Sequence, residues 1–473
     1  MATAASRNEG FLTLLRKKNF LLLWLAQLIS MTAFWAANYG LIILIKEKTS
    51  STTLIGLAII CASLPAVIIG APAGVFVDRR SKRRVLFYSN CLRAIATLGF
   101  VVSLVINSGQ LVVVYLLTLL ISGIGQFFAP AEGATIPMLV NDEELMPALS
   151  LFQITSMLSN ALGFLVLAPL LLIFVPDIHI GSLIFTRIES LYVILAVFYA
   201  ICAALIVLIP AQNFIEPKPR KTTTTELTAE SLGVLQNVWH EMLQAWTFIR
   251  RRPLLFEAVI QLSFAGILFA VIGQIAPSLV TDLLGLPATS MAFVFAPAGV
   301  GLVLGSLIMP RTTSFLGKER TILIGCIALT VLVALIPLST LLAHHLEQQE
   351  IPVGALHVIV VTLLMFLAGI ALDFINIPAN TTMQEKTPDW IKGRVLALQL
   401  AFFNGISIPV ILLIGWITDQ FTLPVTLYFM ALCIAAFGFW GMYYEHKSHP
   451  REHEAEDMDA DLEQELEAEQ IIR

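Results

Sequence analysis

Residues 54–84 read LIGLAIICASLPAVIIGAPAGVFVDRRSKRR, and the order of their apolar and charged side chains decides the fold class. The first 24 of these residues carry no charge, and Asp78 and five Arg or Lys residues follow them. A helix of about 20 apolar residues spans the hydrocarbon core of a bilayer, which is about 30 Å thick. The stretch therefore predicts a membrane-spanning helix that ends in a basic loop.

The same kind of apolar run recurs along the whole chain of 473 residues. Apolar residues make up 57% of the chain and charged residues only 13%, whereas a soluble domain carries roughly 25% charged residues. This composition excludes a soluble enzyme, a nucleic-acid-binding protein and a disordered scaffold. We predict an all-α membrane protein with twelve membrane-spanning helices, at approximately residues 20–45, 54–77, 85–106, 111–136, 147–175, 190–209, 254–280, 288–310, 321–343, 353–378, 395–417 and 423–444.

Lys and Arg residues are distributed unevenly between the two sides of the predicted membrane segments. If both termini lie on one side, that side carries 24 of the 28 Lys and Arg residues. The other side carries Lys46, Lys48 and Arg187, and Arg93 lies within a span. Cytoplasmic loops of membrane proteins are enriched in Lys and Arg. We therefore expect a multi-pass protein of the cell (inner) membrane with both termini in the cytoplasm.

The longest polar stretch between spans divides the chain into two halves of six helices each. Within this stretch, apolar residues from Leu232 to Ile249 recur at spacings of three and four, which predicts an amphipathic helix on the inner membrane surface. The C-terminal tail carries a net charge of −8. We expect a cytoplasmic N-terminus (1–19), a first six-helix bundle (20–209), a cytoplasmic linker (210–253), a second six-helix bundle (254–444) and an acidic cytoplasmic tail (445–473).

The two halves share features that indicate an internal duplication. Gly70 and Gly74 have GxxxG spacing ahead of basic residues, and Gly301 and Gly305 repeat this spacing in the second half. Small residues at this spacing allow helices to approach closely, so we expect these glycines to lie where one bundle contacts the other. Parallel repeats of six helices are one of the known transporter architectures. The sequence therefore predicts two pseudo-symmetric six-helix bundles.

Several motifs resemble those of a known family. The pattern Gly74-x-x-x-Asp78-Arg79-x-x-Lys82-Arg83 is similar to the signature loop of the major facilitator superfamily. Three further patterns resemble its drug- and siderophore-exporting branch, near the macrolide efflux proteins and the enterobactin exporter: Trp24-x-x-Gln27-x-x-Ser30, Pro130-Ala131…Pro137 and Gln384-Glu385…Pro388…Gly393-Arg394-Val395. The resemblance extends over roughly residues 11–445. It implies the major facilitator fold and transport by rocking of one bundle against the other.

The resemblance also implies a role for the residues around the signature loop. Asp78 is expected to face the start of the helix near Arg394, where a carboxylate paired across the bundles would favour one of two conformations. The alternative is that the basic residues only set the orientation of the protein in the membrane. We predict that conformational gating involves Gly70, Gly74, Asp78, Arg79, Lys82, Arg83, Gly393 and Arg394.

Four charged residues fall within the predicted spans, namely Arg93, Glu132, Glu257 and Asp373. A charge at the centre of a membrane helix costs about 2.5–3.5 kcal/mol on insertion scales, so such residues are candidates for functional sites. Glu257 lies near the inner end of its helix, where we expect it to be solvated. Arg93 and Glu132 lie at similar depths in their helices, and we predict that they form a structural ion pair.

Asp373 is the strongest candidate for proton coupling or for binding a charged substrate. The resemblance implies that its helix lines a central cavity. An unpaired carboxylate in such a cavity would bind a proton or the charge of a cationic substrate. A hydrogen-bonded structural aspartate is the alternative. Glu132 is the second candidate for carrying the proton.

Polar and aromatic residues on the predicted cavity helices suit an amphipathic ligand, although Gln and Asn also hold helices together. We predict a cavity lined by Gln27, Trp35, Asn38, Tyr39, Gln126, Gln261, Gln274 and Asn376. No metal site or cofactor is predicted, because the five cysteines lie in apolar runs without CxxC spacing. His446, His449 and His453 lie in the acidic tail, which we expect to be solvated.

These patterns predict a secondary active transporter rather than an enzyme, with a small amphipathic organic substrate and no nucleic acid or nucleotide partner. The resemblance implies efflux of a drug-like or macrolide-like compound in exchange for protons, through Asp373 or Glu132. One alternative is a transporter of a siderophore or a lysolipid-like molecule. Another is a membrane receptor or scaffold that docks a partner through the 210–253 linker and the acidic tail.

Overall fold

The computed structural model describes residues 13–106, 110–180, 183–214, 242–349, 353–388 and 390–444, and most of these residues are helical. Twelve of the described helices are long and apolar enough to cross a membrane, by length and composition. This number and the helical content confirm the predicted all-α membrane fold. The acidic tail at 445–473 and most of the linker, at 215–241, lie outside the described residues.

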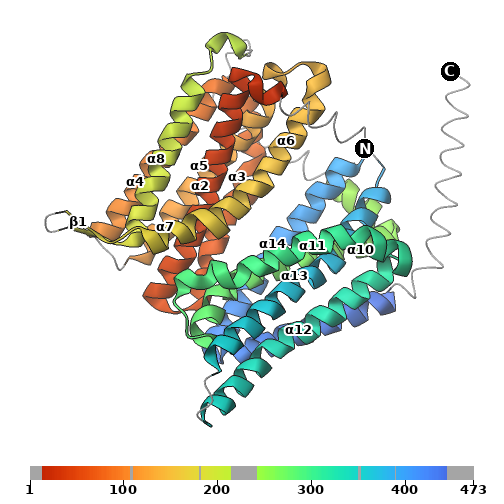
Figure 1. The fold of residues 1–473 in the computed structure, drawn as a ribbon. Helices are drawn as coiled ribbons and strands as arrows, with labels where there is room; N and C mark the ends of the chain where they lie inside the picture. The colour runs from red at the N-terminus through yellow and green to blue at the C-terminus, as the bar shows by residue number, and fades with distance from the viewer. Residues whose placement is uncertain are drawn as a thin grey trace, which may run out of the picture. The chain divides into compact units, whose positions relative to one another are not determined.

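The chain forms two compact units (Figure 1). The N-terminal unit comprises Met1–Leu235 and Ala288–Ala292, and the C-terminal unit comprises Gln236–Pro287 and Phe293–Arg473.

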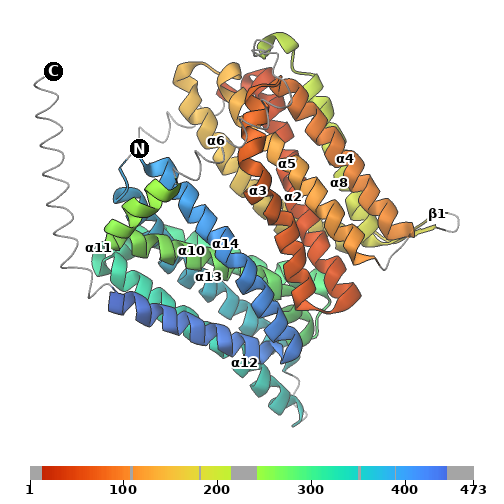
Figure 2. The ribbon, with the colours of Figure 1, turned by 180° about the vertical axis from the view of Figure 1, so that it is seen from behind.

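The N-terminal unit is a bundle of long helices. Local signals set where several of them begin: the Ser51 hydroxyl accepts a hydrogen bond from the Leu54 N–H, and Asn141 with Glu144 forms a capping box. Helices α4 and α8 lie side by side in both views (Figures 1 and 2). The helices are α2 (Lys18–Thr49), α3 (Thr52–Asp78), α4 (Lys82–Ile106), α5 (Leu111–Leu139), α6 (Asp142–Ala161), α7 (Ala168–Phe174) and α8 (Arg187–Val207).

Helix α6 continues into α7 through a π-helical segment, η1 (Leu162–Leu167). Gly163 in this segment packs against α2 so closely that a Cβ atom would overlap the Thr32 carbonyl and lie 2.8 Å from the Trp35 Cβ. An extra residue in a helical turn is typical of such π segments. The glycine therefore allows the fifth membrane segment to contact the first at close range.

A short β-hairpin precedes α8. Strands β1 (Ile178–Ile180) and β2 (Leu183–Phe185) pair antiparallel, with Ile178 opposite Phe185. This hairpin adds two short strands to a unit that we predicted as wholly helical, and it leaves the predicted fold class unchanged.

The C-terminal unit is also a bundle of long helices, and α12 and α13 are in extensive contact within it. Its elements are a helical stretch at 242–251, α10 (Pro253–Ser278) with the π-helical η3 (Leu279–Leu283), α11 (Met291–Leu316), α12 (Lys318–Glu347), α13 (Gly354–Glu385), α14 (Lys392–Gln420) and a final helix (Leu423–Tyr444). The short 3₁₀ helix η4 (Ala288–Ser290) and the first two residues of α11 belong to the N-terminal unit.

The helical stretch at 242–251 is the described part of the predicted amphipathic helix. Ala245 and Ile249 on its apolar side are fully buried, in a cluster that includes Val259 of α10 and Val395 of α14. This face therefore packs against the protein, whereas the sequence led us to expect that it lies on the membrane surface.

The GxxxG glycines differ between the two halves. A Cβ atom at Gly301 would overlap the Phe366 carbonyl, and one at Gly369 would overlap the Ala298 carbonyl, so α11 and α13 cross in close contact. This contact lies within the C-terminal unit, so Gly301 serves a helix crossing inside its own bundle. The expected contact of these glycines with the other bundle stays a prediction. At Gly70 and Gly74, an added Cβ would meet no atom within 4 Å.

Candidate functional site

The first-helix motif directs three side chains toward two neighbouring helices. Trp24 Nε1 donates to Thr155 Oγ1 of α6 at 2.7 Å, and Gln27 Nε2 donates to the Phe152 carbonyl at 3.2 Å. Ser30 Oγ accepts a hydrogen bond of 2.9 Å from Arg93 Nη1 of α4. Residues three apart lie near one side of a helix, so this spacing turns all three side chains toward the adjacent helices α6 and α4.

Arg93 lies at the centre of a buried polar cluster in the N-terminal unit, and only 6% of its surface is exposed. Besides Ser30, its guanidinium contacts the ring faces of Phe128 at 5.6 Å and Tyr199 at 5.4 Å. Gly125 leaves space for this head group, because a Cβ at this position would overlap the guanidinium. Aromatic faces stabilise a cation by their quadrupole, so the cluster holds the charge without a carboxylate in contact.

Glu132 on α5 is 4% exposed, and its Oε1 atom has no hydrogen-bond partner. Across the described part of the chain, no ion pair within 4 Å joins Glu132 to Arg93, so the predicted direct ion pair is not formed in this structure. The physical reason is the position of the guanidinium over Gly125. Glu132 lies seven residues beyond this glycine, or about 10 Å along the helix. The two groups interact electrostatically at longer range.

Asp373 on α13 is 5% exposed and lies against α11. A Cβ at Gly305 would lie 3.0 Å from the Asp373 Cβ and 3.1 Å from its Oδ2, and the backbone of Ser306 also interacts with the carboxylate. No Lys, Arg or His in the described segments forms an ion pair with Asp373. Asn376 follows on the same helix and is half-buried. The C-terminal unit therefore holds a buried carboxylate without a cation.

Seven of the eight predicted cavity-lining residues fall into two groups, and the eighth, Gln261, is buried beside Glu257 on its own helix. Gln27, Gln274 and Tyr39 are buried and join helices: Gln274 Nε2 donates to the Ile411 carbonyl at 2.9 Å, and Tyr39 Oη donates to the Thr289 carbonyl at 2.9 Å within the same unit. The half-buried residues are Trp35, Asn38, Gln126 and Asn376, of which Asn38 and Gln126 bond to carbonyls of their own helices.

The predicted gating residues make contacts within their own units. Lys82 Nζ donates to the Asp78 carbonyl at 2.8 Å, and Arg83 Nη2 donates to the Val207 carbonyl at 2.7 Å. In the C-terminal unit, Arg394 Nη1 donates to Gln244 Oε1 at 3.0 Å. A Cβ at Gly393 would meet no atom within 4 Å. The pairing of Asp78 with the start of α14 stays a prediction.

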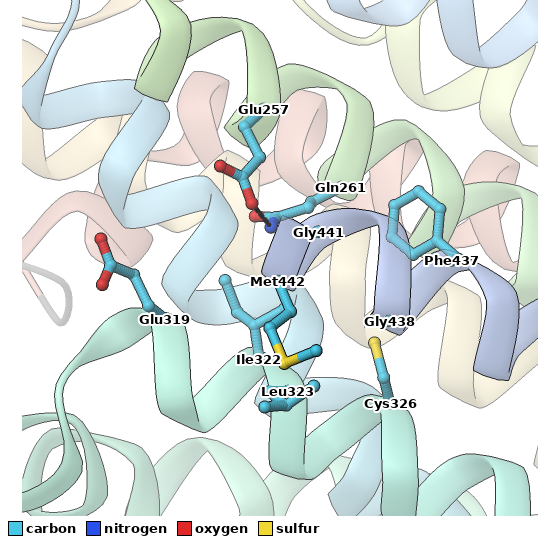
Figure 3. Close-up of a pocket in the computed structure, with 10 residues that line it drawn as sticks. All are labelled: Glu257, Gln261, Glu319, Ile322, Leu323, Cys326, Phe437, Gly438, Gly441 and Met442. Atoms are coloured by element: carbon cyan, nitrogen blue, oxygen red, sulfur yellow. Dashed lines mark hydrogen bonds between the residues drawn. The ribbon is translucent and has the colours of Figure 1, made fainter. Parts of the chain in front are cut away.

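A small pocket in the C-terminal unit was missed by the sequence reasoning (Figure 3). Glu257, expected to be solvated, is only 6% exposed, and its Oε1 accepts a hydrogen bond of 2.7 Å from Gln261 Nε2. A usable signal was present, because a Glu and a Gln four residues apart lie on the same face of a helix. The pocket is lined by Glu257, Gln261, Glu319, Ile322, Leu323, Cys326, Phe437, Gly438, Gly441 and Met442.

Comparison with known proteins identifies the family. Residues 23–410 of the chain match the protein family described as Major Facilitator Superfamily. The chain belongs to the Major Facilitator Superfamily. This confirms the resemblance inferred from the motifs, and it makes the chain a multi-pass membrane protein of a transporter family rather than of an enzyme family.

Two relatives of this major facilitator differ in how much of the chain they match. "Macrolide efflux protein A" of Streptococcus pyogenes is 30% identical over 131 residues, which are 27% of this chain and 32% of that protein. The match thus spans about a third of the length of that relative. "Uncharacterized MFS-type transporter YfiS" of Bacillus subtilis (strain 168) is 22% identical over 392 residues, covering 81% of this chain and 83% of the relative.

Solved structures of other transporters share the fold. A bacterial homologue of the human lysosomal transporter Spinster has a TM-score of 0.66 at 11% identity, covering 91% of this chain and 98% of that one. A bacterial homologue of the iron transporter ferroportin has a TM-score of 0.64 at 14% identity, covering 91% and 99%. The nucleoside transporter NupG has a TM-score of 0.63 at 14% identity, covering 90% and 98%. These similarities establish the fold alone, since the three proteins are only 11–14% identical to this chain.

Proposed function

We propose that this major facilitator is a secondary active transporter that works by alternating access and exports an amphipathic organic compound, drug-like or macrolide-like, in exchange for protons. The observation that carries the proposal is a buried carboxylate within a membrane-spanning helix of each unit, Glu132 on α5 and Asp373 on α13, neither with an ion-pair partner within the described segments. An ionised carboxylate in such surroundings costs several kcal/mol. A bound proton removes this cost, so both groups are suited to take up and release protons during a transport cycle.

Two observations support export of an amphipathic compound. The relative that is 30% identical over 131 residues is named a macrolide efflux protein. The half-buried Trp35, Asn38, Gln126 and Asn376 offer an aromatic face and amide groups, and amphipathic ligands need contacts of both kinds. Siderophores and lysolipids share this amphipathic chemistry, and they belong among the test compounds.

In the proposed cycle, Asp78 and the basic residues that follow it stabilise one of the two conformations. The pairing of Asp78 with the N-terminus of α14 near Arg394 would form in one conformation and break in the other. We also propose that the protein lies in the cell (inner) membrane with both termini in the cytoplasm, because 24 of its 28 Lys and Arg residues fall on that side.

The test uses purified full-length protein in liposomes with an imposed pH gradient and a pH-sensitive dye inside. Macrolides, cationic dyes, siderophores and lysolipids are added one at a time. We expect at least one compound to dissipate the gradient only when the native protein is present. Asp373→Asn or Glu132→Gln should abolish this proton movement, whereas Glu143→Gln, which changes an exposed carboxylate, should leave it intact.

Exchange of labelled substrate without a pH gradient separates proton coupling from substrate binding. A carboxylate that serves only proton coupling is dispensable for exchange, so its amide variant should still exchange substrate. A variant that loses exchange as well has lost a contact with the substrate. If no compound moves protons with the native protein, or if both amide variants retain coupled proton movement, the antiport proposal is wrong.

A further inference from the structure

The pocket in the C-terminal unit lies between α10, α12 and the final helix (Figure 3). Its cavity volume is about 20 Å³, which is room for about one water molecule or an ion of similar size. Gly438 and Gly441 keep the final helix close to the other two: an added Cβ would lie 2.9 Å from the Cys326 Cβ and 3.6 Å from Glu257 Oε1, respectively. The pocket is therefore too small for an organic substrate and of the right size for a single small ion.

Glu257 presents a carboxylate oxygen to this pocket. Oε1 is bonded to Gln261 Nε2, which fixes the orientation of the carboxylate, while the second oxygen points away from Gln261 and has no described hydrogen-bond partner (Figure 3). The residue as a whole is only 6% exposed. An ionised carboxylate with so little exposure carries a free-energy cost unless a cation accompanies it.

The pocket lining supplies no such cation, since none of its ten residues is a Lys, Arg or His. The titratable groups that face Glu257 are Glu319 and Cys326, both on α12, and Glu319 interacts with Glu257 electrostatically. The final helix adds only Phe437, Gly438, Gly441 and Met442 to the lining. Helices α13 and α14 also pack against α10, and neither contributes a residue to the lining. The ten lining residues therefore bring no cation of their own to the Glu257 carboxylate.

We propose that this pocket is a binding site for a small monovalent cation, either a proton or an alkali-metal ion, with the Glu257 carboxylate as its main ligand. Gln261 holds the carboxylate in place, and the lining contains no Lys, Arg or His that would compete with the cation for it. The site lies wholly within the C-terminal unit and involves neither Asp373 nor Glu132. The inference is thus independent of the proposed transport reaction, and its test measures binding rather than transport.

The first experiment is modification of the purified full-length protein by dicyclohexylcarbodiimide, which reacts with protonated carboxyl groups in apolar surroundings. The modified peptide that contains Glu257 is quantified by mass spectrometry from acidic to alkaline buffer, in sodium, potassium or choline chloride. We expect modification at acidic pH that falls by up to about tenfold per pH unit once the proton is released. A sodium or potassium site should also show less modification in that salt than in choline chloride at the same pH.

A second measurement does not depend on access of the reagent. The melting temperature of the native protein should shift with pH, or with sodium or potassium against choline, and Glu257→Gln should lose most of that shift. Glu143→Gln is the matched control, because it makes the same change at an exposed carboxylate and should keep the full shift. The Gly441→Val variant fills the pocket without changing its charge, and it should reduce the shift as well.

The two sources of the cation give different results. A proton site gives pH-dependent modification that the three salts do not alter, and a metal-ion site gives modification that one alkali-metal chloride suppresses. The proposal is wrong if the melting temperature of Glu257→Gln responds to pH and to salt as the native protein does. It is also wrong if Glu257 is modified to the same extent at every pH and in every salt.

Discussion

At the residue scale, Arg93 shows how the N-terminal unit stabilises a buried cation without a carboxylate in contact. Its guanidinium donates to Ser30 and lies over Phe128 and Tyr199, and Gly125 provides the space. The contacts come from three helices: Ser30 is on α2, Gly125 and Phe128 are on α5 and Tyr199 is on α8. Arg93 therefore ties three helices to α4.

This environment predicts the outcome of exchanging the charges of Arg93 and Glu132. We expect Arg93→Glu to reduce the amount of folded protein strongly, because a carboxylate cannot bond favourably to the two ring faces. The double variant Arg93→Glu with Glu132→Arg should not recover, since the contacts of Arg93 do not include Glu132. Expression and size-exclusion chromatography of both variants measure the effect, and recovery of the double variant to native levels would establish a direct pair instead.

The burial of Glu257 marks the limit of sequence reasoning for single residues. That Glu257 and Gln261 share one face of a helix could be predicted from the sequence, because they are four residues apart. Its burial depends on Glu319 of α12 and on Gly438 and Gly441 of the final helix, which are more than 60 residues away along the chain. Position near a helix end indicates solvation only when no other helix covers that end.

At the scale of helices, the crossing of α11 and α13 depends on glycine at the point of contact. We expect Gly301→Ala to destabilise the protein by about 1–3 kcal/mol, because its Cβ would overlap a backbone carbonyl. A backbone carbonyl cannot move aside by changing rotamer, as a side chain can. Gly405→Ala on α14 is the matched control: an added Cβ there meets no atom within 4 Å. Thermal unfolding in detergent compares the two. Equal melting temperatures for both variants would contradict the close crossing.

The helical stretch at 242–251 makes a second prediction at this scale. Ile249 is fully buried in the core cluster of the C-terminal unit, whereas Leu243 is 43% exposed. Ile249→Ala should therefore cost about 2–5 kcal/mol of stability, as truncation of a core side chain does. Leu243→Ala should have a much smaller effect on the melting temperature. If both variants lower it equally, this helix interacts with the membrane surface, as its periodicity alone had suggested.

At the scale of the whole molecule, the number of spans was predictable because the length and apolarity of each span are local properties. The run at 54–77, for example, lies within α3 at Thr52–Asp78, and the run at 111–136 lies within α5 at Leu111–Leu139. The partners of the glycines were not predictable, since GxxxG spacing states that a helix approaches closely without stating which helix does so. Gly301 packs within its own unit, and Gly70 has no neighbour at the position of a Cβ.

The orientation of the whole chain in the membrane can be tested at the two ends of α5. Gln110 precedes this helix and Asn141 follows it, and both are exposed. If both termini are cytoplasmic, Gln110 faces the outside and Asn141 faces the cytoplasm.

A membrane-impermeant maleimide should then label Gln110→Cys in intact cells and Asn141→Cys only after permeabilisation. The background for both variants has Cys61, Cys91 and Cys433 replaced by serine. These three native thiols are exposed or half-buried, while Cys202 and Cys326 are buried. The opposite labelling pattern would reverse the orientation, and the basic signature loop would then face the outside.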